Sequence, residues 1–233
     1  MKAGINMEKL FGGEFYAEKA LERIDASQER ILEDGITLER IGLHNEIAEP
    51  REMQDCIFGN PEADIENWHP QLESNSCAVA CQEYIAEQLL DSDFSEEKMI
   101  DFAERKGWYR PETGTTIGDI GKLLESMGLE VERGMQYSVS DLAEELETDG
   151  KVIVGVNNMI LENPEYADFP GITANHAVQV IGIDASDPEN ISVILNDPGG
   201  ENGKGRIIPM KTFQRAWETS NNYAAIARKG AAV

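Results

Sequence analysis

The apolar pattern of this chain changes period near residue 150, and this change limits the folds that the chain can adopt. Before that point, apolar residues recur with helical spacing, which predicts helices over residues 77–90, 95–105, 115–127 and 138–146. After it come the continuous apolar runs typical of buried strands, over residues 151–157, 176–184, 191–196, 206–209 and 223–228, with a helical turn at 210–217. Helices followed by an antiparallel sheet predict an α+β fold.

The length of 233 residues allows one domain or a domain with an appendage. Residues 14–33 form an amphipathic helical pattern, and residues 36–55 are polar and resemble a linker. We therefore predict an N-terminal helical appendage over residues 1–55 and a main domain over residues 56–233. The appendage would pack on the main domain, dock a partner or block a site.

The formal net charge is −24, from 44 acidic and 20 basic residues. This balance excludes a nucleic-acid partner, because phosphates require basic patches. The acidic surface either keeps the protein soluble or attracts a basic substrate. No stretch is long and apolar enough to span a membrane or to act as a secretory signal, which predicts a cytoplasmic protein, with signal-independent secretion left open.

The chain has three cysteines: Cys56, Cys77 and Cys81. An odd, small number does not make a disulfide framework, and no second Cys or His pair follows at zinc-site spacing. We expect no metal and no cofactor. The remaining pattern that can carry chemistry is a single reactive cysteine with a distant histidine and aspartate.

Cys77 lies where a polar loop becomes a helix, with Ser74, Asn75 or Ser76 available as the cap. Unpaired N–H groups and the helix dipole stabilise an anion there, so the thiol pKa falls and the nucleophilic thiolate forms. Cys81 lies one turn further into the helix, where the stabilisation of an anion is weak, and we interpret it as a small core residue.

Three polar residues complete the candidate site. Gln71 precedes Cys77 by six positions and offers an amide donor for an oxyanion. His176 begins a buried strand after a loop, a position from which its ring can accept the thiol proton. Asp197 follows the next strand and can hold the ring, although an Asp before Pro198 also simply forms turns. Asn196 is an alternative orienter, but strand alternation points it to the opposite face.

The order Gln71, Cys77, His176, Asp197 resembles that of papain-like cysteine peptidases. The motifs Q-x5-C-A-V-A-C, N-H-A-V-Q-V-I-G-I-D and N-D-P-G, within residues 68–228, are most similar to the double-glycine (bacteriocin) leader peptidase family and its stand-alone relatives. The resemblance implies a papain-like fold, in which the nucleophile helix packs on a C-terminal antiparallel sheet. It also implies Cys77 as nucleophile, His176 as base and then acid, Asp197 as orienter and Gln71 as oxyanion donor.

The sequence departs from this family at two points. Ser76, Cys77 and Ala78 stand where the family usually has Asp or Glu, then Cys, then Gly. The transporter members also continue into a membrane domain and an ATPase, for which this sequence has no matching segment. The expected function is a cysteine peptidase, a thiol hydrolase that acts on a peptide or protein substrate. The alternatives are a deamidase or transglutaminase-like acyl-transfer enzyme on the same fold, and a catalytically silent binding module.

Overall fold

The computed structural model describes residues 56–230. The chain divides into two compact units, Phe58–Asp184 with Ser192–Val233, and Met1–Ile57 with Ala185–Ile191. In the described part of the latter unit, the N–H of Ala185 donates to the carbonyl of Cys56 at 2.9 Å. The predicted appendage, residues 1–55, lies outside the described residues, so a domain boundary at residue 55 stays a prediction.

A seven-stranded sheet forms the centre of the described residues, and it has the order β2-β7-β3-β4-β5-β6, with β1 also paired to β4. The pairings along this order are antiparallel. The strands are β1 (Ile57–Gly59), β2 (Glu130–Gly134), β3 (Lys151–Val156), β4 (His176–Asp184), β5 (Ser192–Asn196), β6 (Arg206–Pro209) and β7 (Ala224–Arg228).

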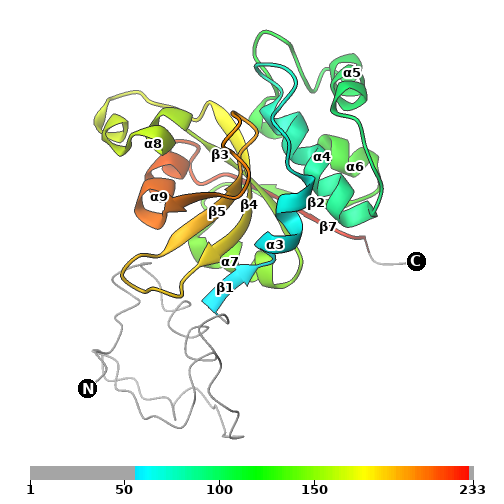
Figure 1. The fold of residues 1–233 in the computed structure, drawn as a ribbon. Coiled ribbons are helices and arrows are strands. Elements are labelled where there is room, and N and C mark those ends of the chain that lie inside the picture. Colours follow the sequence, from blue (N-terminus) through cyan, green and yellow to red (C-terminus); the bar gives the residue numbers. More distant parts are fainter. Residues whose placement is uncertain (1–55, 231–233) are drawn as a thin grey trace, which may run out of the picture. The chain divides into compact units, whose positions relative to one another are not determined.

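Helices cover the sheet, and Figure 1 shows α4, α5 and α6 gathered on one side and α8 and α9 on the other. None of the helices among residues 56–230 has the length and apolar character to cross a bilayer. The helices are α3 (Pro61–Asp64), α4 (Cys77–Leu90), α5 (Glu96–Lys106), α6 (Lys122–Ser126), α7 (Val139–Glu147), α8 (Asn158–Glu162) and α9 (Met210–Glu218), with 3-10 turns at Ile65–Asn67, Ile117–Asp119 and Pro164–Asp168. The predicted α+β class is confirmed.

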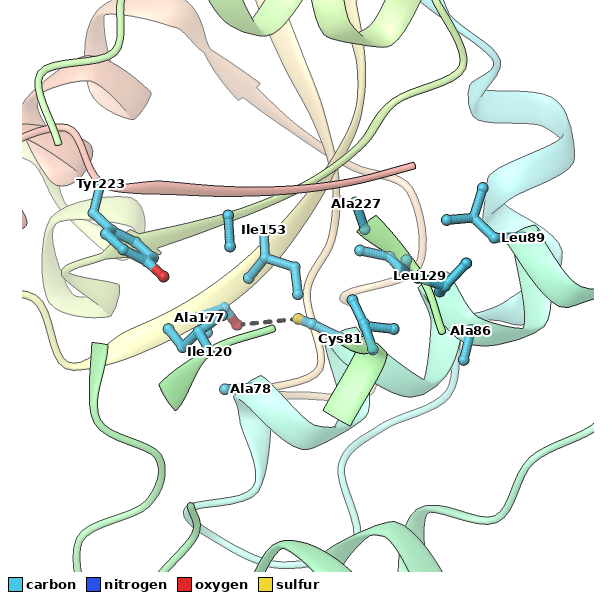
Figure 2. Packing of buried hydrophobic residues seen from close by; sticks show 13 residues of the cluster. Ala78, Cys81, Ala86, Leu89, Ile120, Leu129, Ile153, Ala177, Tyr223 and Ala227 are labelled. Carbon is cyan, nitrogen blue, oxygen red and sulfur yellow. Dashed lines mark hydrogen bonds between the residues drawn. The ribbon is translucent and has the colours of Figure 1, made fainter. Parts of the chain in front are cut away.

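The helix α4 packs against the middle of the sheet, in the core. Cys81 and Ile85 of α4 pack in one apolar cluster with Ile153 of β3 and Ala177 of β4, and all four are almost completely buried (Figure 2). Because side chains alternate along a strand, Val154 of β3 faces the opposite side, and it is also fully buried. Burial on both faces of the sheet explains the continuous apolar runs in the sequence. The packing of α4 on β3 and β4 positions the start of α4 relative to these strands.

The sequence-based prediction was wrong over part of residues 115–127, where we expected one helix. A 3-10 turn at Ile117–Asp119 is followed by a break, and α6 begins only at Lys122. Ile120 is extended at the break, and Gly121 follows with a φ of +93°; a Cβ there would lie 2.7 Å from the side chain of Val131, which explains a glycine at this position. The loop predicted over residues 60–75 also contains the short helix α3, which Asn60 caps.

The start of α7 gives a prediction about stability. Ser138 forms a capping box with Asp141: its Oγ accepts the Asp141 N–H at 3.2 Å, and the Asp141 carboxylate accepts the Ser138 N–H at 2.7 Å. We expect Ser138→Ala to cost about 1 kcal/mol and to lower the melting temperature by about 2–4 °C. Ser140→Ala, inside the helix, is the matched control for thermal unfolding, and an equal loss there would contradict the cap assignment.

Candidate active site

Cys77 is the first residue of α4 and is half-buried. Burial alone would raise the pKa of its thiol. A hydrogen bond with His176, the charge of that ring and the N–H groups of Ala177 and Ala78 outweigh burial, so the pKa of Cys77 lies below its ordinary value. The lowered pKa favours a thiolate at this position, and the His176 ring contributes more to it than the N–H groups do.

His176 is the first residue of β4, where it pairs with Val156 of β3. Its Nε2 lies 2.7 Å from Oδ1 of Asp197, and its side chain is only 8% exposed. Because Nε2 is bonded to Asp197, Nδ1 is the ring nitrogen that can interact with the thiol of Cys77. Burial disfavours the charged ring, but the hydrogen bonds with Asp197 and Cys77 raise the pKa of His176 to about 10. The ring thus bridges the thiol and the carboxylate.

Asp197 follows the last residue of β5, which pairs with β4. Burial alone would raise its pKa, but the hydrogen bond and charge of His176 lower that pKa to about 2. Its Oδ1 also accepts the N–H of Gly199 at 2.9 Å, so Asp197 shapes the turn as well as holding the ring. A Cβ on Gly199 would lie 3.0 Å from the His176 ring, which explains a glycine where the turn passes the imidazole.

Arg206 is a charged neighbour of Asp197 that sequence reasoning missed. Its guanidinium donates to Oδ2 of Asp197 at 2.8 Å and to the carbonyl of Leu161 at 3.2 Å, and it forms an ion pair with Glu162 at 3.0 Å. The two carboxylate oxygens of Asp197 therefore have different partners, one on the ring and one on the guanidinium. β5 pairs with β6, the next strand along the chain, and this pairing places Arg206 opposite Leu195. The pairing of these consecutive strands could have indicated that Arg206 lies near Asp197.

The loop that carries Gln71 is attached to the turn at Asp197. The N–H of Gln71 donates to the carbonyl of Pro198 at 3.0 Å, and Trp68 Nε1 donates to the carbonyl of Asp197 at 2.8 Å. The side-chain Nε2 of Gln71 donates to the carbonyl of Glu73 at 2.6 Å, which uses one of its two N–H bonds. The structure thus brings Gln71 next to the Asp197 turn, with one amide hydrogen left over.

The other cysteines and the asparagine take structural positions. Cys81 is completely buried, its Sγ donates to the carbonyl of Ala177 at 3.6 Å (Figure 2), and burial raises its pKa well above the usual range. Asn196 is also completely buried and donates to the carbonyl of Asp64 at 2.8 Å, away from His176, as alternation predicted. Cys56 is half-buried and directly precedes β1.

His69, two residues before Gln71 in the sequence, belongs to a second polar cluster. Its Nε2 lies 2.8 Å from Glu83, and its Nδ1 lies 3.8 Å from Glu96. One ligand atom from each residue falls within 4.8 Å of the others, a spacing that a metal ion could use. The two ring nitrogens face different carboxylates, however, so a cation bound to the ring and both carboxylates would break one of these contacts. We interpret the cluster as an ion-pair network.

Residues 62–225 match the sequence profile described as "Peptidase_C39 like family". This chain belongs to that family. The matched range contains Cys77, His176 and Asp197, and the family together with the fold supports a peptidase-type function. The expected resemblance to double-glycine leader peptidases and their stand-alone relatives is confirmed at the level of the family.

The relatives extend over most of this chain. An uncharacterized protein of Mycobacterium tuberculosis is 28% identical over 198 residues, which cover 73% of this chain and 84% of the relative, and an uncharacterized protein of Mycobacterium bovis has the same values. The crystal structure of a candidate C39-like peptidase from Bacillus anthracis matches with a TM-score of 0.53 and 15% identity, over 71% of this chain and 95% of the other. This structural match establishes the shared fold.

Proposed function

We propose that this chain is a cysteine peptidase in which Cys77, His176 and Asp197 act as a catalytic triad on a peptide or protein substrate. One observation carries the proposal: a single buried ring lies 2.7 Å from a buried carboxylate and lowers the pKa of a thiol at a helix start. Membership of a peptidase-like family supports it. Few structural roles require a thiol of lowered pKa beside an imidazole of raised pKa.

The geometry supports a specific sequence of bond changes. The thiolate of Cys77 attacks the peptide carbonyl carbon, the carbonyl π electrons move to oxygen, and the oxyanion accepts hydrogen bonds from the Gln71 amide and the Cys77 N–H. The C–N bond then breaks as the His176 ring gives its proton to the leaving amine. Water, deprotonated by the now neutral ring, attacks the thioester carbonyl, and the C–S bond breaks to release the carboxylic acid product and to restore the thiolate beside the protonated ring.

Selective alkylation is the first test of this proposal. Iodoacetamide should modify Cys77 at pH 7 about tenfold faster than a free thiol, because an ordinary cysteine is only a few per cent ionised there. Peptide mapping identifies the modified residue, and Cys56→Ala is the matched control because Cys56 is also half-buried. Equal labelling of Cys56 and Cys77 would contradict the assignment of Cys77 as nucleophile.

A second measurement tests the reaction type. Wild-type protein incubated with a peptide library should produce new amino termini, detected by mass spectrometry, and Cys77→Ala should produce none. Ammonia release without new termini would instead indicate deamidation and would overturn the peptidase assignment. Termini that appear equally with Cys77→Ala would show a contaminating or different activity.

A further inference from the structure

The segment that joins Gln71 to Cys77 is held by a carboxylate from another helix. Glu96 is the first residue of α5, and only 3% of it is exposed. Its Oε2 accepts the N–H of Leu72 at 3.0 Å, and its Oε1 accepts the hydroxyl of Ser76 at 2.6 Å. Leu72 directly follows Gln71, and Ser76 directly precedes Cys77. One carboxylate therefore fixes both ends of the loop between the two proposed oxyanion donors.

Ser76 links Glu96 to the loop through hydrogen bonds with Glu73. It is completely buried, and its Oγ accepts the N–H of Glu73 at 3.1 Å while lying 3.0 Å from the Glu73 carbonyl. That carbonyl in turn accepts the side-chain amide of Gln71. A continuous set of hydrogen bonds therefore connects Glu96, through Ser76 and Glu73, to the amide of Gln71.

The charge of Glu96 is balanced inside the same cluster. Both of its carboxylate oxygens act as acceptors, which suits the ionised form. The pKa of Glu96 is raised, because burial outweighs the hydrogen bonds from Ser76 and Leu72 and the charge of the nearby His69 ring. The hydrogen bond with Glu83 raises the pKa of His69 to about 9, so the ring is cationic at neutral pH. The backbone of His69 is itself anchored, because its carbonyl accepts the hydroxyl of Tyr84.

We propose that Glu96 is a positioning residue for the oxyanion site, acting through Leu72 and Ser76 on the Gln71 amide and the Cys77 N–H. This inference rests on the proposed peptidase function. Hydrogen-bond donors stabilise a developing oxyanion efficiently only when they are fixed in advance, and a displacement of about 1 Å can cost on the order of 100-fold in rate. Glu96 lies behind the loop and is not expected to contact the substrate.

Two small electrophiles separate this role from a general structural one. p-Nitrophenyl acetate is attacked at its carbonyl carbon, so an oxyanion forms before the C–O bond breaks and p-nitrophenolate leaves with the electron pair. Iodoacetamide is attacked at its methylene carbon, the C–I bond breaks as the C–S bond forms, and no oxyanion appears. Both reagents need the Cys77 thiolate, but only the ester needs the oxyanion donors.

Glu96→Gln should therefore slow acylation by p-nitrophenyl acetate about tenfold or more while leaving the iodoacetamide rate near the wild-type value. Glu97→Gln is the matched control, because Glu97 is the next residue of α5 and is exposed. Ser76→Ala removes the Glu96–Ser76 contact and the contacts of Ser76 with Glu73, so it should give the same pattern. In a Gln71→Ala background, the effect of Glu96→Gln should shrink, because one of the two donors is already absent.

The outcomes distinguish the failure of this inference from the failure of the proposed function. If Glu96→Gln changes neither rate, or lowers both rates equally, Glu96 does not position the oxyanion site. If Cys77→Ala reacts with p-nitrophenyl acetate as fast as the wild type does, the proposed function itself fails. Circular dichroism and thermal unfolding of each variant show whether it is folded, and Ser76→Ala provides the same comparison if Glu96→Gln does not fold.

Discussion

Replacing His176 by alanine is expected to slow acylation of Cys77 by p-nitrophenyl acetate at pH 7 by about 100- to 10,000-fold. The ring supplies both the hydrogen bond and the charge that lower the pKa of the Cys77 thiol. Without the ring, burial would raise that pKa above its ordinary value, and almost no thiolate would remain at neutral pH. Burst kinetics of p-nitrophenolate release measure the acylation rate directly.

The pH dependence of alkylation shows in which direction His176 shifts the pKa of the Cys77 thiol. In the wild type, the ion pair of thiolate and imidazolium exists above the lowered pKa of Cys77 and below about 10, where His176 loses its proton. The iodoacetamide rate should therefore already be high at pH 7. In His176→Ala it should be low at pH 7, rise by about tenfold per pH unit and level off only above pH 9.0, the ordinary value for the thiol. Coinciding pH profiles for the two proteins would show that the ring does not activate Cys77.

Local signals were enough to find the central residues of the candidate site. Cys77 was predicted from the change of loop into helix, and the structure places it at the first position of α4. His176 and Asp197 were predicted from the ends of two consecutive apolar runs. The hairpin of β4 and β5 brings those ends together, with Gln179 opposite Asn196. Consecutive strands usually pair, so this part of the geometry can be read from the order of the chain.

The roles of Glu96 and Gly121 could not be predicted, because their contacts depend on tertiary placement. Glu96 reaches Ser76 only because α5 packs beside the start of α4, and nothing in the sequence near Glu96 indicates a buried carboxylate. The insertion of β7 between β2 and β3 is likewise a long-range pairing. Gly121 also looked like one residue of a helix, and only its φ of +93° and the nearby Val131 side chain show why a glycine stands at the break.

Replacing Asp197 by alanine is expected to reduce acylation of Cys77 by about 100-fold, because the ring would lose the partner that fixes its orientation. Asp197→Asn should lose much less activity at pH 7, since its amide oxygen can still accept the Nε2 hydrogen of His176. It removes the negative charge, however, and that charge raises the pKa of His176. The upper end of the active pH range should therefore move to lower pH in Asp197→Asn. Acylation rates measured from pH 6.5 to about 10 test both statements.

The neighbouring residue is the matched control for Asp197, because strand alternation gives the two side chains opposite surroundings. Asn196 donates to the carbonyl of Asp64 at 2.8 Å and to Gln179 at 3.2 Å, inside the core. Asn196→Ala should therefore lower the free energy of unfolding by about 1–3 kcal/mol while leaving the acylation rate of the folded protein near the wild-type value. If Asn196→Ala lowers acylation as much as Asp197→Ala does, the loss reflects damage to the end of β5, and Asp197 would not act by orienting His176.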